Sequence, residues 1–362
     1  MKKSNSERYN EITKDLLIHY GKNNSNTVLS PFSILSLLCM AADSTDTTTK
    51  EEVIEMICNG MDYQEFRRFV VELTHRFSKC HTLKSANALC VNETIGESIK
   101  SDYLMMLSSD YDAKVFASEN IINDINSWVN KKTNGMIDRI ADESMKKSDL
   151  LACLMNAVCF DSKWQEPYET KDISEDEFHN ADGTTSEVKM LSSSEIEYIS
   201  DDAFEGFVKP YKGNEYSFMA LLPKDDQSRS ISDSLKQIDF SGLFENRKRQ
   251  DVIVDMPEFS YDFSEDLSAY LQSLGVKKIF TPEACFSPMT DEWIKADGII
   301  HKAHIELDRK GTKAAAVSTM IMVAGCADIF ETPYICLNRP FVYAIMHNES
   351  GLPVFVGITN EL

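Results

Sequence analysis

The spacing of apolar residues changes character near residue 150. Before it, apolar side chains recur every three or four residues, which is the spacing of one face of an α-helix. Ser or Thr begins several of these segments and Gly ends several, as residues at helix termini commonly do. We therefore expect helices at residues 9–20, 30–40, 49–60, 66–77 and 122–135.

After residue 150 the apolar residues form short runs that are typical of β-strands. The run from Leu151 to Phe160 is apolar almost throughout, which predicts a central strand buried on both faces. Further strands are expected at 204–210, 216–222, 252–256, 299–307, 336–346 and 354–358, and one helix at 263–274. Helices followed by strands, without a Pro- or Gly-rich linker, indicate one α+β domain of residues 1–362.

The charge of the chain argues against several classes of partner. Its 362 residues include 58 acidic and 37 basic side chains, a formal charge of −21. Nucleic acids, heparin and anionic membranes bind basic surfaces, so we expect none of them as a partner. No apolar run approaches the ~20 residues of a membrane span. The basic start, Met1-Lys2-Lys3-Ser4, lacks the apolar segment of a leader. We would expect an extracellular protein if a leader has been removed and a cytoplasmic one otherwise.

Motifs for catalysis or metal binding do not occur in the sequence. It contains no H-E-x-x-H, G-x-S-x-G or phosphate-binding Gly-rich motif. His301 and His304 would lie on opposite faces of a strand, so we expect a hydrogen-bonded structural role for His301 rather than a shared metal. The nine Cys include no C-x-x-C pair, which favours buried free thiols over disulfides or zinc. Most lie in apolar runs, as do Cys39, Cys90, Cys153 and Cys159. We expect neither an enzyme nor a cofactor.

The stretch from Gly311 to Cys326 has features of both a strand and a loop. Its second half is apolar and β-prone, yet it leads into the loop-like residues 327–333. In a strand starting at Thr312, alternate residues on one face would be small and then adaptable: Thr312, Ala314, Ala316, Ser318, Met320 and Met322. Lys313 would face solvent, and a slip of one residue would bury it. Small side chains on one face would let such a strand pack where a sheet leaves little room. The alternative is an Ala-rich surface helix.

Several motifs, in order along the chain, resemble those of the serpin family of protease inhibitors. They are N-T-V-L-S-P-F-S-I at 26–34, L-M-N-A-V-C-F at 154–160 followed by Trp164 and Pro167-Tyr168, L-L-P at 221–223, M-P-E-F at 256–259, I-H-K-A at 300–303, N-R-P-F at 338–341 and F-V-G at 355–357. The resemblance extends from about residue 6 to the end. It implies a single-domain α+β serpin fold, in which a mostly helical N-terminal region packs on a large mixed sheet. An exposed reactive-centre loop would span about 311–335.

The resemblance also implies a mechanism, suicide inhibition. A target serine protease cleaves the loop and forms an acyl-enzyme, and the hinge then inserts into the main sheet and traps the protease. The hinge here is Gly311, Thr312, Lys313, Ala314, Ala315 and Ala316. Non-inhibitory serpins usually carry Pro or a charge at its inward positions, and this chain does not. Inhibition is therefore favoured over a carrier or chaperone role, and cross-class inhibition of cysteine proteases is a further alternative.

Two supporting sites follow from the resemblance. The shutter, a polar cluster that holds the sheet closed, corresponds to Ser30, Ser33, Asn156 and His301. The breach, where insertion begins, corresponds to Trp164, Glu258 and Arg309. The family usually has Lys and Glu where this chain has Glu258 and Arg309. We expect these two to form the same contact with exchanged charges; the alternative is two unrelated surface charges.

The loop also indicates a class of target. Counting from the hinge glycine, the family pattern places the reactive bond at Gly325-Cys326, within one or two residues. It is preceded by specificity residues Met322, Val323 and Ala324. No Lys or Arg occurs between Lys313 and Arg339, which argues against trypsin-like targets. Small aliphatic residues favour elastase-like or subtilisin-like proteases; Asp328 and Phe330, suited to caspase-like and chymotrypsin-like enzymes, lie too far downstream. We expect a monomer without heparin activation.

Overall fold

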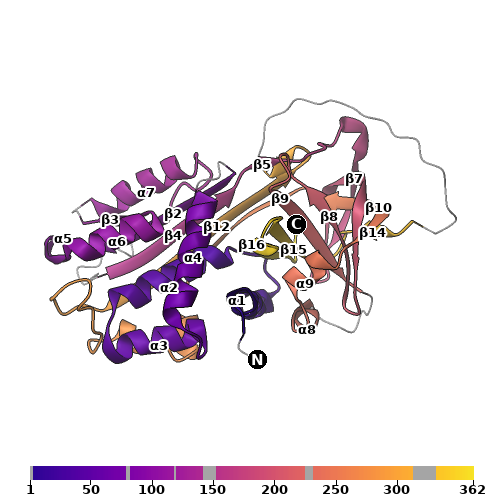
Figure 1. Cartoon of the computed structure of the whole chain (residues 1–362). Coiled ribbons are helices and arrows are strands. Elements are labelled where there is room, and N and C mark those ends of the chain that lie inside the picture. The colour runs from indigo at the N-terminus through magenta and orange to yellow at the C-terminus, as the bar shows by residue number, and fades with distance from the viewer. Residues whose placement is uncertain (1–2, 79–81, 118–119, 142–151, 225–230, 313–331) are drawn as a thin grey trace. The chain divides into compact units, whose positions relative to one another are not determined.

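The structure, a computed structural model, describes residues 3–78, 82–117, 120–141, 152–224, 231–312 and 332–362 (Figure 1). The chain forms two compact units whose segments alternate along the sequence. The first unit comprises residues 1–9, 30–159 and 262–304, and the second comprises residues 10–29, 160–261 and 305–362. Helix α1 (Asn5–Tyr20) and strand β12 (Ala296–Asp308) contribute residues to both.

Helices are prominent in the first unit, as the apolar spacing predicts. Helix α2 (Pro31–Ser44) follows Ser30, where the predicted helix 30–40 begins, and is buried along nearly its whole length, because its sequence is apolar on all sides. Helix α3 (Thr47–Cys58) begins two residues before the predicted start, since the carboxylate of Asp46 caps it by accepting from the Thr47 N–H. The others are α4 (Tyr63–Ser78), α5 (Glu93–Ser98), α6 (Ser101–Tyr111), α7 (Ile121–Lys132) and α10 (Ser268–Ser273).

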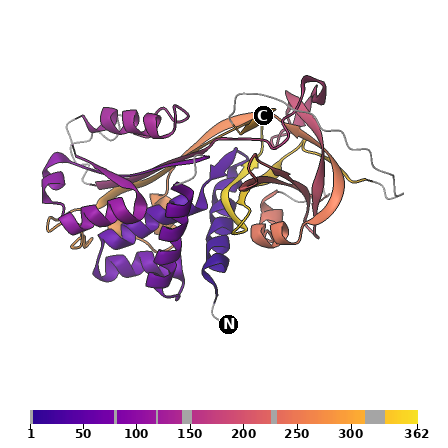
Figure 2. The ribbon, with the colours of Figure 1, turned by 45° about the horizontal axis from the view of Figure 1, so that its top comes forward.

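The sheet of the first unit contains the predicted central strand. Its strands follow the order β3 (Ala113–Phe116), β2 (Leu83–Val91), β4 (Ala152–Phe160) and β12, and β11 (Phe259–Asp266) also pairs with β12. Every residue of β4 is buried, which confirms the prediction. Figure 2 shows α7 on one face of these strands and helices α2–α4 on the other. Ile125 and Val129 of α7 belong to the same apolar cluster as Met155 and Ala157 of β4.

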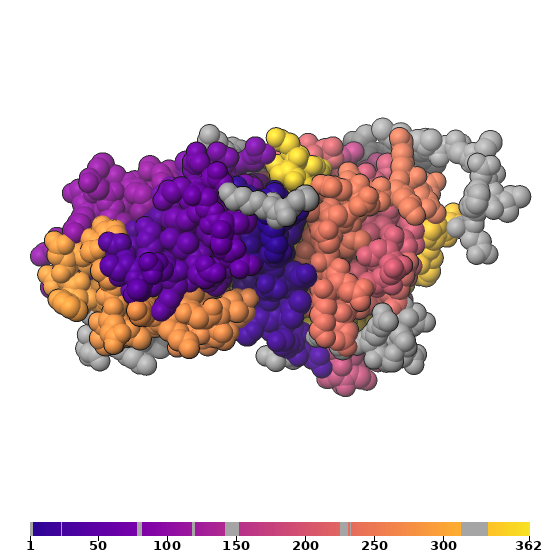
Figure 3. All heavy atoms as spheres, turned by 60° about the horizontal axis from the view of Figure 1, so that its bottom comes forward, coloured from indigo at the N-terminus to yellow at the C-terminus, as the bar shows by residue number. Residues whose placement is uncertain are grey.

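Residues 275–295, which follow α10, lie against α3 on the face seen in Figure 3. The carboxylate of Glu52 in α3 accepts from the N–H groups of Lys277 and Lys278, both at 2.8 Å. The N–H of Asp46 donates to the carbonyl of Cys285 at 2.9 Å. These bonds hold a long connection, which includes the short 3-10 helix η4 (Lys278–Phe280), against the helices.

The second unit is mostly β-structure, as predicted. Its main sheet has the strand order β1 (Thr27–Leu29), β16 (Leu352–Thr359), β15 (Phe341–His347), β9 (Tyr216–Pro223), β8 (Phe204–Pro210), β7 (Thr185–Ser200), β10 (Lys248–Pro257) and β14 (Tyr334–Cys336). Strand β6 (Ile173–His179) pairs with β7. The short strands β5 (Ser162–Lys163) and β13 (Gly311–Thr312) pair with each other, and β13 also pairs with the end of β12. Helices α8 (Ile231–Leu235) and α9 (Phe240–Glu245) complete it.

Two sequence predictions are wrong in this region of the fold. The expected helix at 263–274 is confined to α10, because residues up to Asp266 pair with β12 as part of β11. The expected strand at 336–346 is two strands, since residues 337–340 contain Pro340, which has no N–H for a ladder bond. The long strand β7 was not predicted, because it is polar along most of its exposed side.

Two further observations concern the thiols and the membrane. The described cysteines are free, and Cys39, Cys90, Cys153 and Cys159 are all buried, as predicted. Within the described ranges, no helix combines the length and the apolar character that crossing a membrane requires.

Candidate functional site: the β4–β12 pair and the hinge turn

Strands β4 and β12 pair directly and in parallel in the first unit. The register runs from Ala152 opposite Ala296 to Cys159 opposite His304. Over these residues no other strand lies between the two. The two strands are therefore direct hydrogen-bonded neighbours along this stretch of the sheet.

A buried polar cluster crosses this pair of strands. Asn156 of β4 and His301 of β12 are opposite each other in the register, and Asn156 Oδ1 lies 3.2 Å from His301 Nδ1. The N–H of Ser30 donates to His301 Nε2 at 3.3 Å. Three of the four predicted shutter residues are thus brought together directly. Ser33 joins through Ser85, whose hydroxyl lies 3.5 Å from its own.

The directions of the bonds made by His301 and Asn156 follow from one donor. A backbone N–H can only donate, so Nε2 of His301 accepts this hydrogen bond. The ring proton is therefore on Nδ1, which donates a hydrogen bond to Asn156 Oδ1. The Asn156 amide then donates to Ser85 Oγ at 3.2 Å and to Asn87 Oδ1 at 2.7 Å. Burial lowers the pKa of His301 to about 3. The ring is therefore neutral, which this bonding pattern requires.

Ser30 has a different role from the helix cap that its sequence predicts. It occupies the cap position of α2, but its side chain makes no capping bond. Its backbone N–H, at the start of the helix, is instead satisfied by His301. Separating β4 from β12 breaks the bond between His301 and Asn156, at a cost of about 1–3 kcal/mol for each buried polar group left unpaired.

The turn that begins the hinge, residues 308–311, lies in the second unit and has its polar backbone groups engaged. The Asp308 carboxylate accepts from the N–H groups of Lys310 and Gly311, at 2.7 and 3.1 Å. The carbonyls of Arg309 and Lys310 accept from the N–H groups of Tyr168 and Trp164, each at 2.9 Å. The turn is therefore held by its own aspartate and by the segment 164–168.

Aromatic side chains continue this contact to Thr312, the second hinge residue. The indole N–H of Trp164 donates to the Asp308 carbonyl at 2.9 Å. The Trp164 ring stacks on Tyr211, with centroids 4.6 Å apart and planes 9° apart. The Tyr211 hydroxyl lies 2.7 Å from the Thr312 hydroxyl, and Thr312 is fully buried. The burial agrees with the inward face predicted for Thr312.

Gly311 cannot be replaced by a larger residue without strain. Its φ of 151° lies in a region that favours glycine. A Cβ atom there would approach the Ser162 carbonyl oxygen to 2.2 Å and the Lys163 Cα to 2.6 Å. Both are backbone atoms of the neighbouring strand β5. The glycine is thus required by the close approach of two strands at the start of the hinge.

Arg309 and Glu258 do meet, but not through the expected pair of opposite charges. The backbone N–H of Arg309 donates to Glu258 Oε1 at 3.0 Å. Among the ion pairs of the described residues, none joins these two side chains. The backbone N–H of any residue except proline could make this contact at position 309, so the arginine side chain is not needed for it.

Sequence reasoning missed a buried charged pair beside Trp164. Lys209 of β8 and Glu195 of β7 form an ion pair with a 2.6 Å Nζ–Oε1 distance, and their side chains are only 4% and 9% exposed. Burial by itself lowers the pKa of Lys209, but Tyr168 and Glu195 raise it above its ordinary value. The available signal was a lysine inside the apolar run 204–210, because buried lysines are normally paired.

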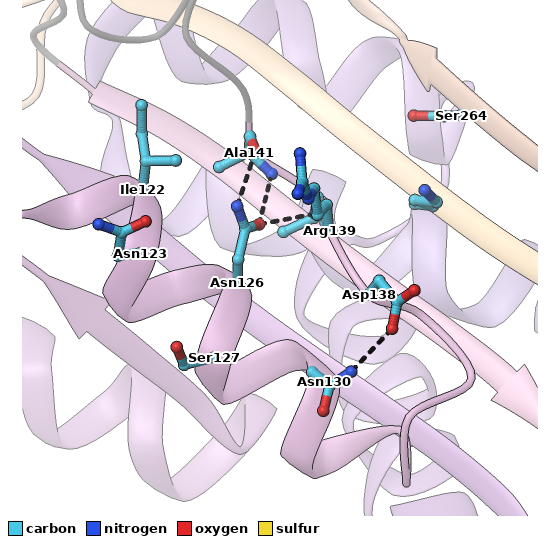
Figure 4. Close-up of a pocket in the computed structure, with 11 residues that line it drawn as sticks. Ile122, Asn123, Asn126, Ser127, Asn130, Asp138, Arg139, Ala141 and Ser264 are labelled. Atoms are coloured by element: carbon cyan, nitrogen blue, oxygen red, sulfur yellow. Dashed lines mark hydrogen bonds between the residues drawn. The ribbon is translucent and has the colours of Figure 1, made fainter.

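A pocket of about 800 Å³ opens in the first unit between α7 and strands β11 and β12 (Figure 4). Asn126 Oδ1 accepts from the N–H groups of Ile140 and Ala141, both at 2.9 Å. Asn130 donates to the Asp138 carboxylate at 2.9 Å. These bonds hold the segment 138–141 on α7, so part of the polar lining serves packing over the sheet.

His301 and His304 have separate partners, as their spacing predicts. His304 Nδ1 lies 3.0 Å from Asp262 Oδ1, on the other face of β12 from the His301 cluster. The remaining predicted site residues fall outside the described part of the chain. They are the hinge residues Lys313, Ala314, Ala315 and Ala316, the specificity residues Met322, Val323 and Ala324, and the reactive bond Gly325-Cys326.

Comparison with known proteins gives a consistent picture. The family model described as "Serpin (serine protease inhibitor)" matches residues 7–361. Leukocyte elastase inhibitor A of Mus musculus is 30% identical over 355 residues, covering 92% of each chain. The thermophilic serpin tengpin in its native state is 30% identical, with a TM-score of 0.87 over 100% of this chain and 96% of its own. Its latent state gives a lower TM-score of 0.80, with 100% of both chains covered. Thyroxine-binding globulin, at 22% identity and a TM-score of 0.84 over 98% of each chain, shares the fold.

Proposed function

The chain belongs to the serpin family, and from this premise we propose that it is a serine protease inhibitor acting as a suicide substrate. Serpins are mostly protease inhibitors rather than enzymes, and some of them are not inhibitory. In our proposal a protease cleaves the loop and forms an acyl-enzyme. The hinge then enters between β4 and β12, and the protease is trapped as a covalent complex.

One observation carries this proposal: the hinge is already a strand at its first two residues. Gly311 and Thr312 pair with Asp308 and Leu307 on one side and with Lys163 and Ser162 on the other. Farther down β12, from His304 to Ala296, the partner is β4 itself. Insertion would thus extend an existing strand, so the costly first step of pairing is already made.

The small alternate residues of the hinge support extension in this direction. In an inserted strand that continues from Thr312, the inward positions would be Ala314, Ala316 and Ser318, and the charged Lys313 would fall on the other face. Small side chains reduce the volume that must be accommodated between strands whose facing residues are closely packed. A carrier role would not require this pattern, and the likeness to thyroxine-binding globulin is one of fold alone.

We further propose elastase-like or subtilisin-like proteases as targets. The residues around the proposed bond, Val323, Ala324, Gly325 and Cys326, are small and uncharged, which suits a shallow specificity pocket. The relative from Mus musculus is named a leukocyte elastase inhibitor, which supports the same choice. No basic residue between Lys313 and Arg339 could serve a trypsin-like enzyme.

The test is incubation with pancreatic elastase, subtilisin and trypsin, followed by gel electrophoresis in SDS. We expect a complex stable in SDS with elastase or subtilisin and none with trypsin. Mass spectrometry of the released C-terminal peptide locates the bond, expected within two residues of Gly325-Cys326. Clean cleavage without a complex, and without a large rise in melting temperature after cleavage, would instead indicate a non-inhibitory serpin.

A further inference from the structure

Lys209 and Glu195 are a buried pair whose place in the fold is not explained by stability. Their Nζ–Oε1 distance is 2.6 Å and both side chains are almost fully removed from solvent. Replacing a buried ion pair by apolar residues of similar volume is often neutral or stabilising. The role of this pair is therefore better inferred from the groups that it contacts.

The ammonium group of Lys209 lies over two aromatic rings. Its Nζ is 4.5 Å from the centroid of Tyr168 and 5.6 Å from that of Trp164. A cation at this distance is attracted by the negative face of a ring, and more strongly when water is excluded. Ser193 completes the cluster, since its hydroxyl donates to Glu195 at 2.7 Å and lies 3.2 Å from the Tyr168 hydroxyl.

Both of these aromatic residues hold the turn that begins the hinge. Tyr168 donates its N–H to the Arg309 carbonyl, and Trp164 donates its N–H and its indole N–H to the carbonyls of Lys310 and Asp308. Trp164 also stacks on Tyr211, which contacts the Thr312 hydroxyl. A continuous path of contacts therefore runs from the buried pair on β7 and β8 to Thr312 in the hinge.

We propose that Lys209 and Glu195 are positioning residues that hold this turn and so set the rate at which the hinge strand enters the sheet. Glu195 keeps the Lys209 ammonium in place, and the ammonium fixes the rings of Tyr168 and Trp164 against the turn. Without the cation the rings remain buried but lose the contact that orients them. The inference rests on the proposed function, since it concerns the step of insertion.

The test uses insertion of a synthetic peptide, which needs no protease. The probe is the hinge sequence T-K-A-A-A-V-S-T-M-I-M, residues 312–322, incubated with the full chain and followed as a more heat-stable complex on native gels. Lys209→Met should raise the rate of peptide insertion on the order of tenfold, because the cation–ring contact is lost. Lys209→Arg, which keeps a cation over the rings, should restore the rate to near that of the parent chain.

A double variant separates positioning from stability. Lys209→Met alone leaves Glu195 buried without its partner and can impair folding. Lys209→Met combined with Glu195→Leu removes both charges, so we expect native stability close to that of the parent chain with insertion still accelerated. The matched control is Arg247→Met. This variant breaks the ion pair between Arg247 and Glu197 of β7, which has a 2.9 Å Nε–Oε2 distance and side chains that are 30% and 33% exposed. It should leave the rate of peptide insertion unchanged.

The outcomes distinguish the two proposals. Insertion at the parent rate in the double variant, or no rescue by Lys209→Arg, would overturn the positioning role and leave the inhibitor proposal standing. A parent chain that takes up no peptide at any temperature below unfolding would contradict insertion itself, and with it the proposed function.

Discussion

Acid should weaken the closed sheet through His301. Burial lowers the pKa of this ring to about 3, whereas a histidine in an unfolded chain titrates near 6.5. Because the pKa is lower in the folded state, the unfolded state takes up the proton first as the pH falls. The stability that the neutral ring contributes is therefore complete above about pH 6.5 and is lost progressively down to about pH 3.

The size of the effect follows from the same two pKa values. At 1.36 kcal/mol for each pKa unit, the loss is about 2 kcal/mol at pH 5 and roughly 4 kcal/mol at pH 3. Protonation would also place a second N–H at Nε2, directly against the Ser30 N–H that donates to it. The bond across β4 and β12 depends on the same ring, so acid should favour opening of this pair.

The assay is urea unfolding of the native chain at pH 7.5 and pH 5.0, compared with His301→Gln and Ser85→Ala. His301→Gln should cost about 1–3 kcal/mol at pH 7.5, and its difference from the parent chain should shrink by about 2 kcal/mol at pH 5.0. Ser85→Ala removes a hydroxyl from the same cluster but no titrating group, so its cost should be equal at both pH values. If His301→Gln lost as much stability on acidification as the parent chain, the reasoning would be refuted.

Three further predictions concern the hinge. Gly311→Ala should lower the free energy of unfolding of the native form by more than about 2 kcal/mol, measured by thermal unfolding, because its Cβ would meet a backbone oxygen at 2.2 Å. Ala314→Arg should turn the inhibitor into a substrate in the SDS-gel assay, whereas Lys313→Ala, on the opposite face, should still form the complex; equal behaviour of the two would contradict the hinge register. Glu258→Ala should cost about 1 kcal/mol and Arg309→Ala less than about 0.5 kcal/mol in urea unfolding, because the contact uses the backbone N–H of Arg309. A large loss of stability in Arg309→Ala would instead support an ion pair between the two side chains.

Residues of the site could be predicted from the sequence only where a family motif includes them. Asn156 and His301 were identified from the family motifs, and the structure brings them into one hydrogen-bonded cluster. Ser85 and Asn87, which complete that cluster, lie on β2, a strand whose polar and small residues gave no clear alternation. The sequence shows that the charges at Glu258 and Arg309 are reversed relative to the family pattern. The contact between the two residues uses the backbone N–H of Arg309, however, and side-chain identity does not reveal such a bond.

The sequence by itself determined the local elements and the chemistry of the hinge. Helix periodicity, the apolar run of β4 and the small inward residues after Thr312 depend on neighbours a few positions apart, so they can be read directly. Tertiary structure alone decided which polar groups meet. Asn156 and His301 are 145 residues apart in the chain, and the Lys209 ammonium reaches rings that come from another segment. Such partners are selected by the packing of strands and by the need to satisfy every buried polar group, and neither requirement leaves a local pattern.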